Sequence, residues 1–586
     1  MRAVAVILTV VFLSAALAGC VSEQKSGAPA KAPGSRKLGA ADPAEYRDVL
    51  SKPIYDLATL IKENVKVASF DGKRMDNWVY RPKTEADAKV PVFINFSPYW
   101  YNLAPSSEQR GDAFSKYMID YFVPRGYAVV LSSVRGTGYS EGCFNIGGEY
   151  EMRDAVAVIE HFAKQPWSNG NIAAGGKSYD GTTPQGAAVK APPALKAIFP
   201  VSGISELYKY NYKGGIPYGN GASFNTYYYA GESAAPREAQ APLFMVDRVA
   251  CPYLPEMQAN GVGSAVTGDY TAYWQERNYT KNAKNVKAAL FFVHGFTDWN
   301  VKPDHILPWL NEIPVDTPRK VWLHNWVAND RGSRDGHVYP RRDDWNTTML
   351  RFLDETLKEI PTGIFDEPAY QIQDSADQWR WEEKWPPDDA VTMRYFFANK
   401  DGRRTLDPAA PTTPTTGTYN DGAGAGGGGL CSQVASAASH IRYEMAPLEK
   451  DLQIAGVPIV HVQAATDRPY GEVIATLCDV PTSGPPVMIN WGGLNFRHRI
   501  SLENAQPVVP DTVYDLQFPL FPQDDVVRAG SKLVLFVAGT GGQYSSILNG
   551  NTVSVRENGK AWIDLPVDPT LEMESPQPVK IPCFAC

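Results

Sequence analysis

Short apolar runs alternate with longer amphipathic or irregular stretches from about residue 41 to residue 360. Stretches 115–122 and 149–162 have the apolar spacing of helices. Several of the short runs lack polar alternation, as expected for strands that are buried on both faces. The pattern predicts an α/β domain over residues 41–364. Its strands are expected at 90–96, 127–134, 172–175, 194–201, 288–293 and 320–326.

The interval between residues 202 and 287 breaks this rhythm. It is dense in tyrosine, glycine and proline, with helix-like pieces at 241–248 and 270–279. We interpret about 203–286 as a helical cap inserted over the carboxyl edge of the sheet, where α/β proteins bind their ligands. A surface excursion that is packed by its own aromatic residues is the alternative.

After about residue 365 the pattern changes to short alternating runs with turn residues between them, which is typical of a β-sandwich. We therefore expect a second domain over 365–586. Residues 401–430, rich in Gly, Pro and Thr, are expected to form a loop. The strands are expected at 369–372, 393–398, 441–445, 459–463, 472–477, 513–518, 532–537 and 552–556.

The N-terminus carries an export signal. Arg2 precedes an apolar run, and the small residues Leu17-Ala18-Gly19 stand directly before Cys20. This arrangement resembles a bacterial lipobox, which implies a signal peptide over 1–19, lipid on the Cys20 thiol and a flexible tether over 20–40. The apolar run is too short to span a bilayer. We expect an exported lipoprotein held to the outer face of the cell membrane by lipid alone; a plain secretory signal is the alternative.

Charge and cysteine content add two constraints. The 586 residues carry a formal net charge of -8, spread along the chain, so nothing indicates a nucleic-acid partner. Apart from Cys20, an even number of cysteines remains, which fits up to three disulfides in an exported protein without defining their pairing. These cysteines are Cys143, Cys251, Cys431, Cys478, Cys583 and Cys586.

One stretch contains a candidate nucleophile. The small-residue strand ending in Gly175-Gly176-Lys177 runs into Ser178, and an alanine-rich segment suited to a helix follows. Such a strand–turn–helix lifts a serine hydroxyl clear of the sheet. Asp180 stands where the common G-x-S-x-G pattern has its last glycine, so an ordinary glycine-rich turn stays possible. A phosphate-binding loop would need glycine in place of Asn171.

Two later stretches supply partners for this serine. Asp298 follows the run at 288–293, and His337 lies in a polar, glycine-punctuated loop after the next run. The order Ser178, Asp298, His337 is that of an α/β-hydrolase triad. The histidine would take the serine proton, and the aspartate would fix the imidazole tautomer. His305 and His324 are alternative bases.

The developing negative charge of the substrate oxygen needs hydrogen-bond donors. The backbone N–H of Tyr179, directly after the nucleophile, would provide one. Tyr99, at the end of the first strong apolar run, is the candidate for the second.

With these stretches identified, the chain resembles the Xaa-Pro dipeptidyl-peptidase family of serine hydrolases, peptidase family S15, which includes CocE/NonD-type cocaine-esterase-like enzymes and α-amino-acid ester hydrolases. This family's elbow reads G-x-S-Y-x-G. The resemblance implies Ser178 as nucleophile, Asp298 as orienting acid, His337 as base, an oxyanion hole of Tyr99 and the Tyr179 amide, and a C-terminal jelly roll. It rests on Gly176-Lys177-Ser178-Tyr179-Asp180-Gly181, Val134-Arg135-Gly136-Thr137-Gly138-Tyr139-Ser140-Glu141-Gly142, Ser97-Pro98-Tyr99 and Asp298-Trp299-Asn300-Val301.

An Xaa-Pro peptidase must hold a proline ring in an apolar pocket and a free N-terminal ammonium beyond it. Tyr179, Tyr208 and Trp299 are candidates for the pocket, and Glu206 and Asn300 for the polar end. We expect no metal or other cofactor.

Three functions are compatible with the sequence. The first is a serine exopeptidase that releases Xaa-Pro dipeptides from proline-containing peptides. The second is an esterase or amidase of the same fold acting on small acyl esters. The third is a noncatalytic lipoprotein whose sandwich binds carbohydrate or cell wall.

Overall fold

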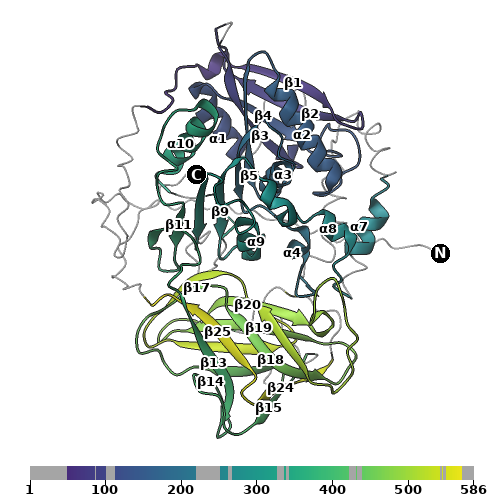
Figure 1. Ribbon diagram of the computed structural model, residues 1–586, viewed down its shortest axis with the longest axis vertical. Coiled ribbons are helices and arrows are strands. Elements are labelled where there is room, and N and C mark those ends of the chain that lie inside the picture. The colour runs from purple at the N-terminus through teal and green to yellow at the C-terminus, as the bar shows by residue number, and fades with distance from the viewer. Residues whose placement is uncertain are drawn as a thin grey trace, which may run out of the picture.

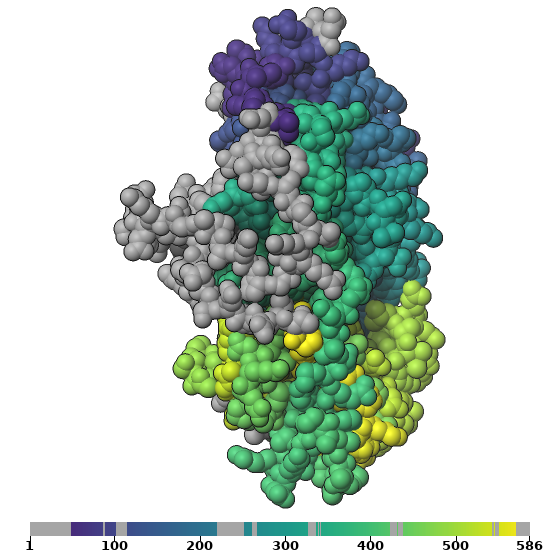
Figure 2. Space-filling view, turned by 60° about the vertical axis from the view of Figure 1, so that its left-hand side comes forward, coloured from purple at the N-terminus to yellow at the C-terminus, as the bar shows by residue number. Residues whose placement is uncertain are grey.

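Two β-rich units are stacked along the long axis of the molecule in the computed structural model (Figure 1). Figure 2 shows the purple-to-teal catalytic unit above the green-to-yellow C-terminal unit. The structure describes residues 49–85, 88–100, 113–218, 251–261, 267–325, 336–337, 339, 342–421, 431, 438–541, 544 and 550–569. Cys20, Cys583 and Cys586 lie outside these residues.

The catalytic unit contains a ten-stranded sheet of order β1-β2-β4-β3-β5-β6-β9-β10-β11-β12. Strands from β4 to β11 in this order are parallel, and the pairs β1–β2, β2–β4 and β11–β12 are antiparallel. All six expected strands are present. The bounds are β1 Ile61–Ala68, β2 Arg74–Arg81, β3 Val90–Ser97, β4 Ala128–Ser133, β5 Ser168–Lys177, β6 Leu195–Val201, β9 Ala289–Gly295, β10 Arg319–His324, β11 Tyr370–Gln373 and β12 Trp379–Glu382.

Helices cover both faces of this sheet. α1 (Ala113–Phe122) and α10 (Trp345–Lys358) lie on one side, and α2 (Glu149–Ala163) and α3 (Tyr179–Ala188) on the other (Figure 1). Successive side chains of a strand point to opposite faces, so Phe291 joins the core under α1 and α10 whereas Phe292 joins the other core. Burial on both faces explains why the runs in these strands lack polar alternation.

The described parts of the cap lie between β6 and β9. They comprise α4 (Leu207–Asn211), the hairpin of β7 (Tyr212–Lys213) and β8 (Ile216–Pro217), α7 (Leu254–Gly261) and α8 (Ala272–Glu276). The expected helix at 270–279 corresponds to α8, and the one at 241–248 lies outside the described residues.

The tip of the cap hairpin touches the C-terminal unit. The Asn495 amide donates a hydrogen bond of 2.8 Å to the Gly214 carbonyl. A Cβ at Gly214, where φ is +59°, would lie 2.1 Å from the Gly493 oxygen. Only glycine fits this approach.

The C-terminal unit is a 13-stranded β structure around a large apolar core, and it is the expected β-sandwich. Two of its strands, β14 and β15, lie within the 401–430 segment that we expected to be a loop, so that expectation is wrong for 403–407 and 415–420. The strands are β13 Val391–Lys400, β14 Arg403–Asp407, β15 Thr415–Asn420, β16 His440–Glu444, β17 Leu452–Gly456, β18 Ile459–Thr466, β19 Glu472–Val480, β20 Val487–Asn495, β21 Tyr514–Pro519, β22 Gln523–Val527, β23 Lys532–Ala538, β24 Thr552–Glu557 and β25 Trp562–Val567.

One expected sandwich strand belongs elsewhere. The run at 369–372 forms β11, which pairs in parallel with β10 and extends the catalytic sheet, followed by β12. By sheet membership the catalytic unit therefore continues to Glu382, beyond the expected boundary at 364. The short apolar run at 369–372 has a sequence pattern that fits a strand of either domain. Its backbone pairing with β10 assigns it to the catalytic sheet.

Two disulfides join described cysteines. Cys143 pairs with Cys251 across 108 residues, linking the loop after β4 to the cap, and Cys431 pairs with Cys478 across 47 residues. None of the helices in the described part of the chain combines the length and apolar character needed to cross a bilayer.

We expect the double substitution Cys143→Ser with Cys251→Ser to lower the free energy of unfolding by about 2–4 kcal/mol, because it frees a long loop in the unfolded chain. Thermal melting under non-reducing conditions measures this. Cys431→Ser with Cys478→Ser is the matched control and should cost less, since its loop is shorter. An equal or larger loss in the control would contradict the loop-length explanation.

Candidate active site

Three predicted site residues follow the carboxyl ends of neighbouring parallel strands. Ser178 comes directly after β5, Asp298 lies three residues beyond β9, and His337 lies in the loop after β10. The strands β5, β6, β9 and β10 are adjacent in the sheet, so these three residues share one edge. This is the edge at which α/β proteins bind ligands.

Ser178 has a strained backbone. Its φ of 62° and ψ of -123° lie where residues other than glycine are uncommon, between the last residue of β5 and the first of α3. Close packing forces this turn: a Cβ at Gly176 would lie 2.5 Å from Asn95 Nδ2, and one at Gly181 would lie 2.8 Å from the Gly176 oxygen. The strand–turn–helix has the backbone geometry of a nucleophile elbow.

His337 and Asp298 form a hydrogen-bonded pair. His337 Nδ1 lies 2.9 Å from Asp298 Oδ2, and the aspartate is fully buried whereas the imidazole is 12% exposed. Burial alone would raise the pKa of Asp298, but the charge and hydrogen bond of His337 outweigh it and lower the pKa to about 2. The ionised carboxylate only accepts, so Nδ1–H donates and Nε2 is left as the basic nitrogen.

The other carboxylate oxygen is held by the backbone. Asp298 Oδ1 accepts hydrogen bonds from the amides of Asn300, at 3.0 Å, and Val301, at 2.8 Å. The turn after β9 therefore fixes the carboxylate that orients the imidazole.

The described residues around His337 are held by contacts with other parts of the catalytic unit. The Gly336 amide donates to the Thr297 carbonyl at 2.9 Å. Lys177 Nζ lies 3.5 Å from the His337 carbonyl oxygen, which brings the loop beside the residue that precedes Ser178. Tyr339 stacks on Phe114 with ring centroids 4.7 Å apart.

The alternative histidines are placed differently. His305 is fully buried with Nδ1 3.3 Å from Ser205 Oγ, and burial puts its pKa well below the usual value. Burial also lowers the pKa of His324 to about 3. Bases this weak are poorly matched to proton abstraction at neutral pH.

The two oxyanion-hole candidates lie on either side of the elbow. Tyr99 is two residues beyond β3, the neighbour of β5, and its side chain is 36% exposed. Tyr179 is the first residue of α3, where backbone N–H groups point out of the helix N-terminus. Their roles in an oxyanion hole stay predictions.

The side chain of Tyr179 reveals a residue that the sequence did not single out. Its hydroxyl donates to Glu151 Oε2 at 2.7 Å, and the Gly147 amide donates to the same oxygen at 2.9 Å. Thr183 Oγ1 donates to Glu151 Oε1 at 3.1 Å. Glu151 is fully buried on α2, and burial raises its pKa. It therefore clamps both ends of the first turn of α3. The sequence does not show which glutamates become buried, so this role is visible only in the folded structure.

Comparisons with known proteins identify the family of the chain. The family model described as X-Pro dipeptidyl-peptidase (S15 family) matches residues 71–327, and that of the X-Pro dipeptidyl-peptidase C-terminal non-catalytic domain matches 363–562. A Bacillus anthracis relative classed with the Xaa-Pro dipeptidyl-peptidases is 31% identical over 525 residues, covering 83% of this chain and 85% of its own. The chain belongs to the S15 family.

Solved structures support the fold. A CocE/NonD family hydrolase from Staphylococcus aureus aligns with a TM-score of 0.71 at 18% identity, covering 87% of this chain and 93% of its own. An α-amino acid ester hydrolase aligns with a TM-score of 0.65 at 18% identity, covering 92% and 100%. This S15 protein is thus a serine hydrolase with the α/β-hydrolase fold.

Two of the predicted substrate-binding residues of this S15 protein adjoin the triad aspartate. Trp299 packs between the domains, with its ring centroid 5.9 Å from those of both Trp491 and Phe521. Asn300 is exposed, and its Oδ1 accepts a hydrogen bond of 2.7 Å from Tyr210. The nearby charge of Asp298 adds to burial in raising the pKa of Tyr210.

The other two predicted substrate-binding residues, Glu206 and Tyr208, make their contacts within the cap. Glu206 Oε2 lies 3.0 Å from Lys209 Nζ and is largely buried. Tyr208 is fully buried, its hydroxyl donates to the Gly268 carbonyl, and its ring stacks on Tyr212. Their substrate-binding roles stay predictions.

The described residues contain no group of three or more His, Cys, Asp or Glu side chains that could hold a metal ion.

We expect Glu151→Gln to lower kcat by about 10- to 100-fold with little change in KM, less than the roughly 10²–10³-fold cost of deleting an oxyanion donor outright. The amide replaces an oxygen that accepts hydrogen bonds with a donor, which loosens the elbow. Steady-state kinetics with a thermal melt of each variant measures this. Glu149→Gln, two residues earlier on α2 and paired with Lys190 on the surface, is the control. Equal kcat values for the two variants would show that the clamp does not position the elbow.

Proposed function

We propose that this S15 protein is a serine exopeptidase that releases Xaa-Pro dipeptides from peptide N-termini through an acyl-enzyme. The observation that carries the proposal is the buried Asp298–His337 pair on the same sheet edge as the strained elbow of Ser178. The resemblance to Xaa-Pro dipeptidyl-peptidases along most of the chain supports the substrate class.

In this mechanism His337 Nε2 removes the proton from Ser178 Oγ as that oxygen attacks the carbonyl carbon of the second substrate residue. The N–H of Tyr179 and the hydroxyl of Tyr99 donate to the resulting oxyanion. The imidazolium then protonates the leaving amine, and the C–N bond breaks. Water, activated by the same imidazole, hydrolyses the acyl-enzyme and frees the dipeptide.

Asp298 stabilises the imidazolium throughout this cycle. With its pKa lowered to about 2, it is ionised at neutral pH. Its charge is compensated by His337 and by the two backbone amides, so it holds Nδ1–H in one tautomer.

We assign the proline ring to the surface beside Trp299. The substrate ammonium would be bound by Asn300 Oδ1, which accepts from Tyr210 and keeps a second lone pair. Because Asn300 is exposed, a substrate can reach it.

One observation favours an esterase or amidase as the second candidate. The only carboxylate that the sequence suggested for the ammonium, Glu206, is already paired with Lys209 at 3.0 Å. A site with a weakly bound ammonium would accept small acyl esters without a free N-terminus.

Kinetics on four substrates separate the two activities. We expect kcat/KM for the Ala-Pro anilide to exceed that for the Ala-Ala and N-blocked Ala-Pro anilides by about 10- to 150-fold, since each lacks an anchoring group worth about 1.5–3 kcal/mol. Ser178→Ala should abolish turnover. Hydrolysis of an aryl ester without Ala-Pro cleavage would assign the esterase function, and full activity in Ser178→Ala would show that the assigned triad is wrong.

We further propose that the protein is an exported lipoprotein, anchored through Cys20 to the outer face of the cell membrane. The support is the Leu17-Ala18-Gly19-Cys20 sequence after an apolar run.

Expression of Cys20→Ala in a bacterial host should move the protein from the membrane fraction to the soluble exported fraction, since a lipid chain supplies the anchor. Fractionation and immunoblotting of wild type and variant measure this. Cys583→Ala is the control and should leave the distribution unchanged; a Cys20→Ala protein that stays in the membrane fraction would contradict the anchor.

A further inference from the structure

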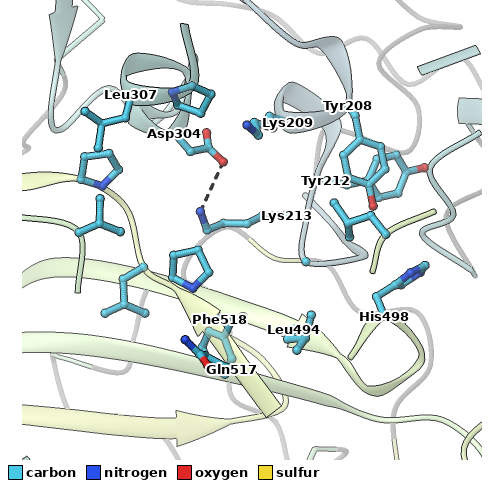
Figure 3. A pocket seen from close by; sticks show the side chains of 18 of the residues that line it. Tyr208, Lys209, Tyr212, Lys213, Asp304, Leu307, Leu494, His498, Gln517 and Phe518 are labelled. Carbon is cyan, nitrogen blue, oxygen red and sulfur yellow. Dashed lines mark hydrogen bonds and ion pairs between the residues drawn. The ribbon is translucent and has the colours of Figure 1, made fainter. Parts of the chain in front are cut away.

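A cavity of about 360 Å³ lies between the cap and the sandwich (Figure 3). Its walls come from α4, β7 and α9 (Ile306–Leu310) on one side and from β20 and β21 on the other. None of Ser178, Asp298 and His337 is among the described residues that line it. Its volume lies within the range of small-molecule sites, about 300–1,000 Å³.

Most of the lining is apolar. Leu307 and Pro308 of α9 face Leu494, Phe518 and Leu520 of the sandwich across the cavity. Such walls suit an apolar side chain or a proline ring. The hydrophobic part of a ligand would therefore contact both domains.

Two charged side chains enter this apolar space. Lys213 and Asp304 are each only 8% exposed, and Lys213 Nζ lies 3.4 Å from Asp304 Oδ2 (Figure 3). Lys213 Nζ also lies 4.2 Å from the ring centroid of Phe521. An ammonium has three N–H donors, and Asp304 Oδ2 is the single hydrogen-bond acceptor of Lys213 among the described residues.

Neither Lys213 nor Asp304 has its full set of hydrogen bonds among the described residues. Asp304 Oδ1 is buried and has no hydrogen-bond partner in the described part of the chain. Buried polar groups are nearly always hydrogen-bonded to protein, water or ligand. Burial lowers the pKa of Lys213, against the opposing effect of Asp304, so the protein alone stabilises this ammonium poorly. A second anion beside Lys213 would stabilise it.

We propose that the cavity is a second ligand site, for a short zwitterionic peptide with apolar side chains. Lys213 binds the carboxylate of the peptide, the Asp304 carboxylate accepts from its ammonium, and the apolar walls hold its side chains. The choice of a dipeptide rests on the proposed function, because the reaction releases a molecule with these groups. Tyr208, expected from the sequence to bind substrate, lines this cavity.

Calorimetry with the full mature chain tests the site, using Ala-Pro, N-acetyl-Ala-Pro and Ala-Pro amide as probes. We expect wild type to bind Ala-Pro at least about tenfold more tightly than either capped probe, because each cap removes one charged hydrogen bond. Lys213→Met should bind Ala-Pro and its amide equally. Asp304→Asn should bind Ala-Pro and its N-acetyl form equally.

Two further variants separate the cavity from the active site. Leu494→Trp fills the cavity without touching either charge, so it should abolish calorimetric binding while kcat/KM on the anilide stays unchanged. Lys209→Met is the matched control: Lys209 also lines the cavity but is paired with Glu206, so the preference for uncapped Ala-Pro should persist.

Several outcomes would overturn the site: no binding of Ala-Pro to wild type, equal affinity for capped and uncapped probes, or undiminished binding to Leu494→Trp. Thermal melts establish that each variant is folded. Since binding is read without turnover, these results are independent of the Ser178→Ala kinetics that decide the proposed function.

Discussion

The active site depends on holding one serine in a backbone conformation that it would not adopt alone. Such strained positions cost about 1–3 kcal/mol and persist only where the surroundings over-determine them. Here the Ser178 amide donates to the Val201 carbonyl of β6 at 2.9 Å, which fixes the turn to the sheet. Glu151 fixes the other side by accepting from Tyr179 and Thr183 on the first turn of α3. Sheet pairing and a buried carboxylate together offset the strain.

The turn after β9 combines two tasks in three residues. Its amides hold the Asp298 carboxylate that orients the imidazole, while Trp299 and Asn300 project beside the triad. The aspartate that orients the imidazole and the two predicted substrate-binding residues therefore lie on one turn. Because Trp299 also rests on Trp491 and Phe521, the sandwich supports the substrate side of the site.

Much of the catalytic domain could be predicted because its strands are buried on both faces and its site residues follow strand ends. Residue type, order and motif single out Ser178, Asp298 and His337 as the candidate triad, and the structure places all three at one edge of the sheet. Glu151 and Asp304 could not, since their importance comes from what lies around them after folding. The strand β11 was assigned to the wrong domain because an apolar run of four residues carries no information about its pairing partner.

This misassignment bears on how the molecule could be divided. The model of the C-terminal domain begins at residue 363, yet β11 and β12, which lie after that point, complete the catalytic sheet. Arg380 on β12 in turn makes two hydrogen bonds, of 2.9 and 2.6 Å, to Asp524 on β22 of the sandwich. Cutting the chain at that junction would strip the sheet of an edge and leave β10 with unpaired backbone groups, a template for self-association. A chimaera made from the domains of two relatives should therefore be joined after Glu382. Its sandwich must also keep an aspartate at the position of Asp524, so that Arg380 retains its partner.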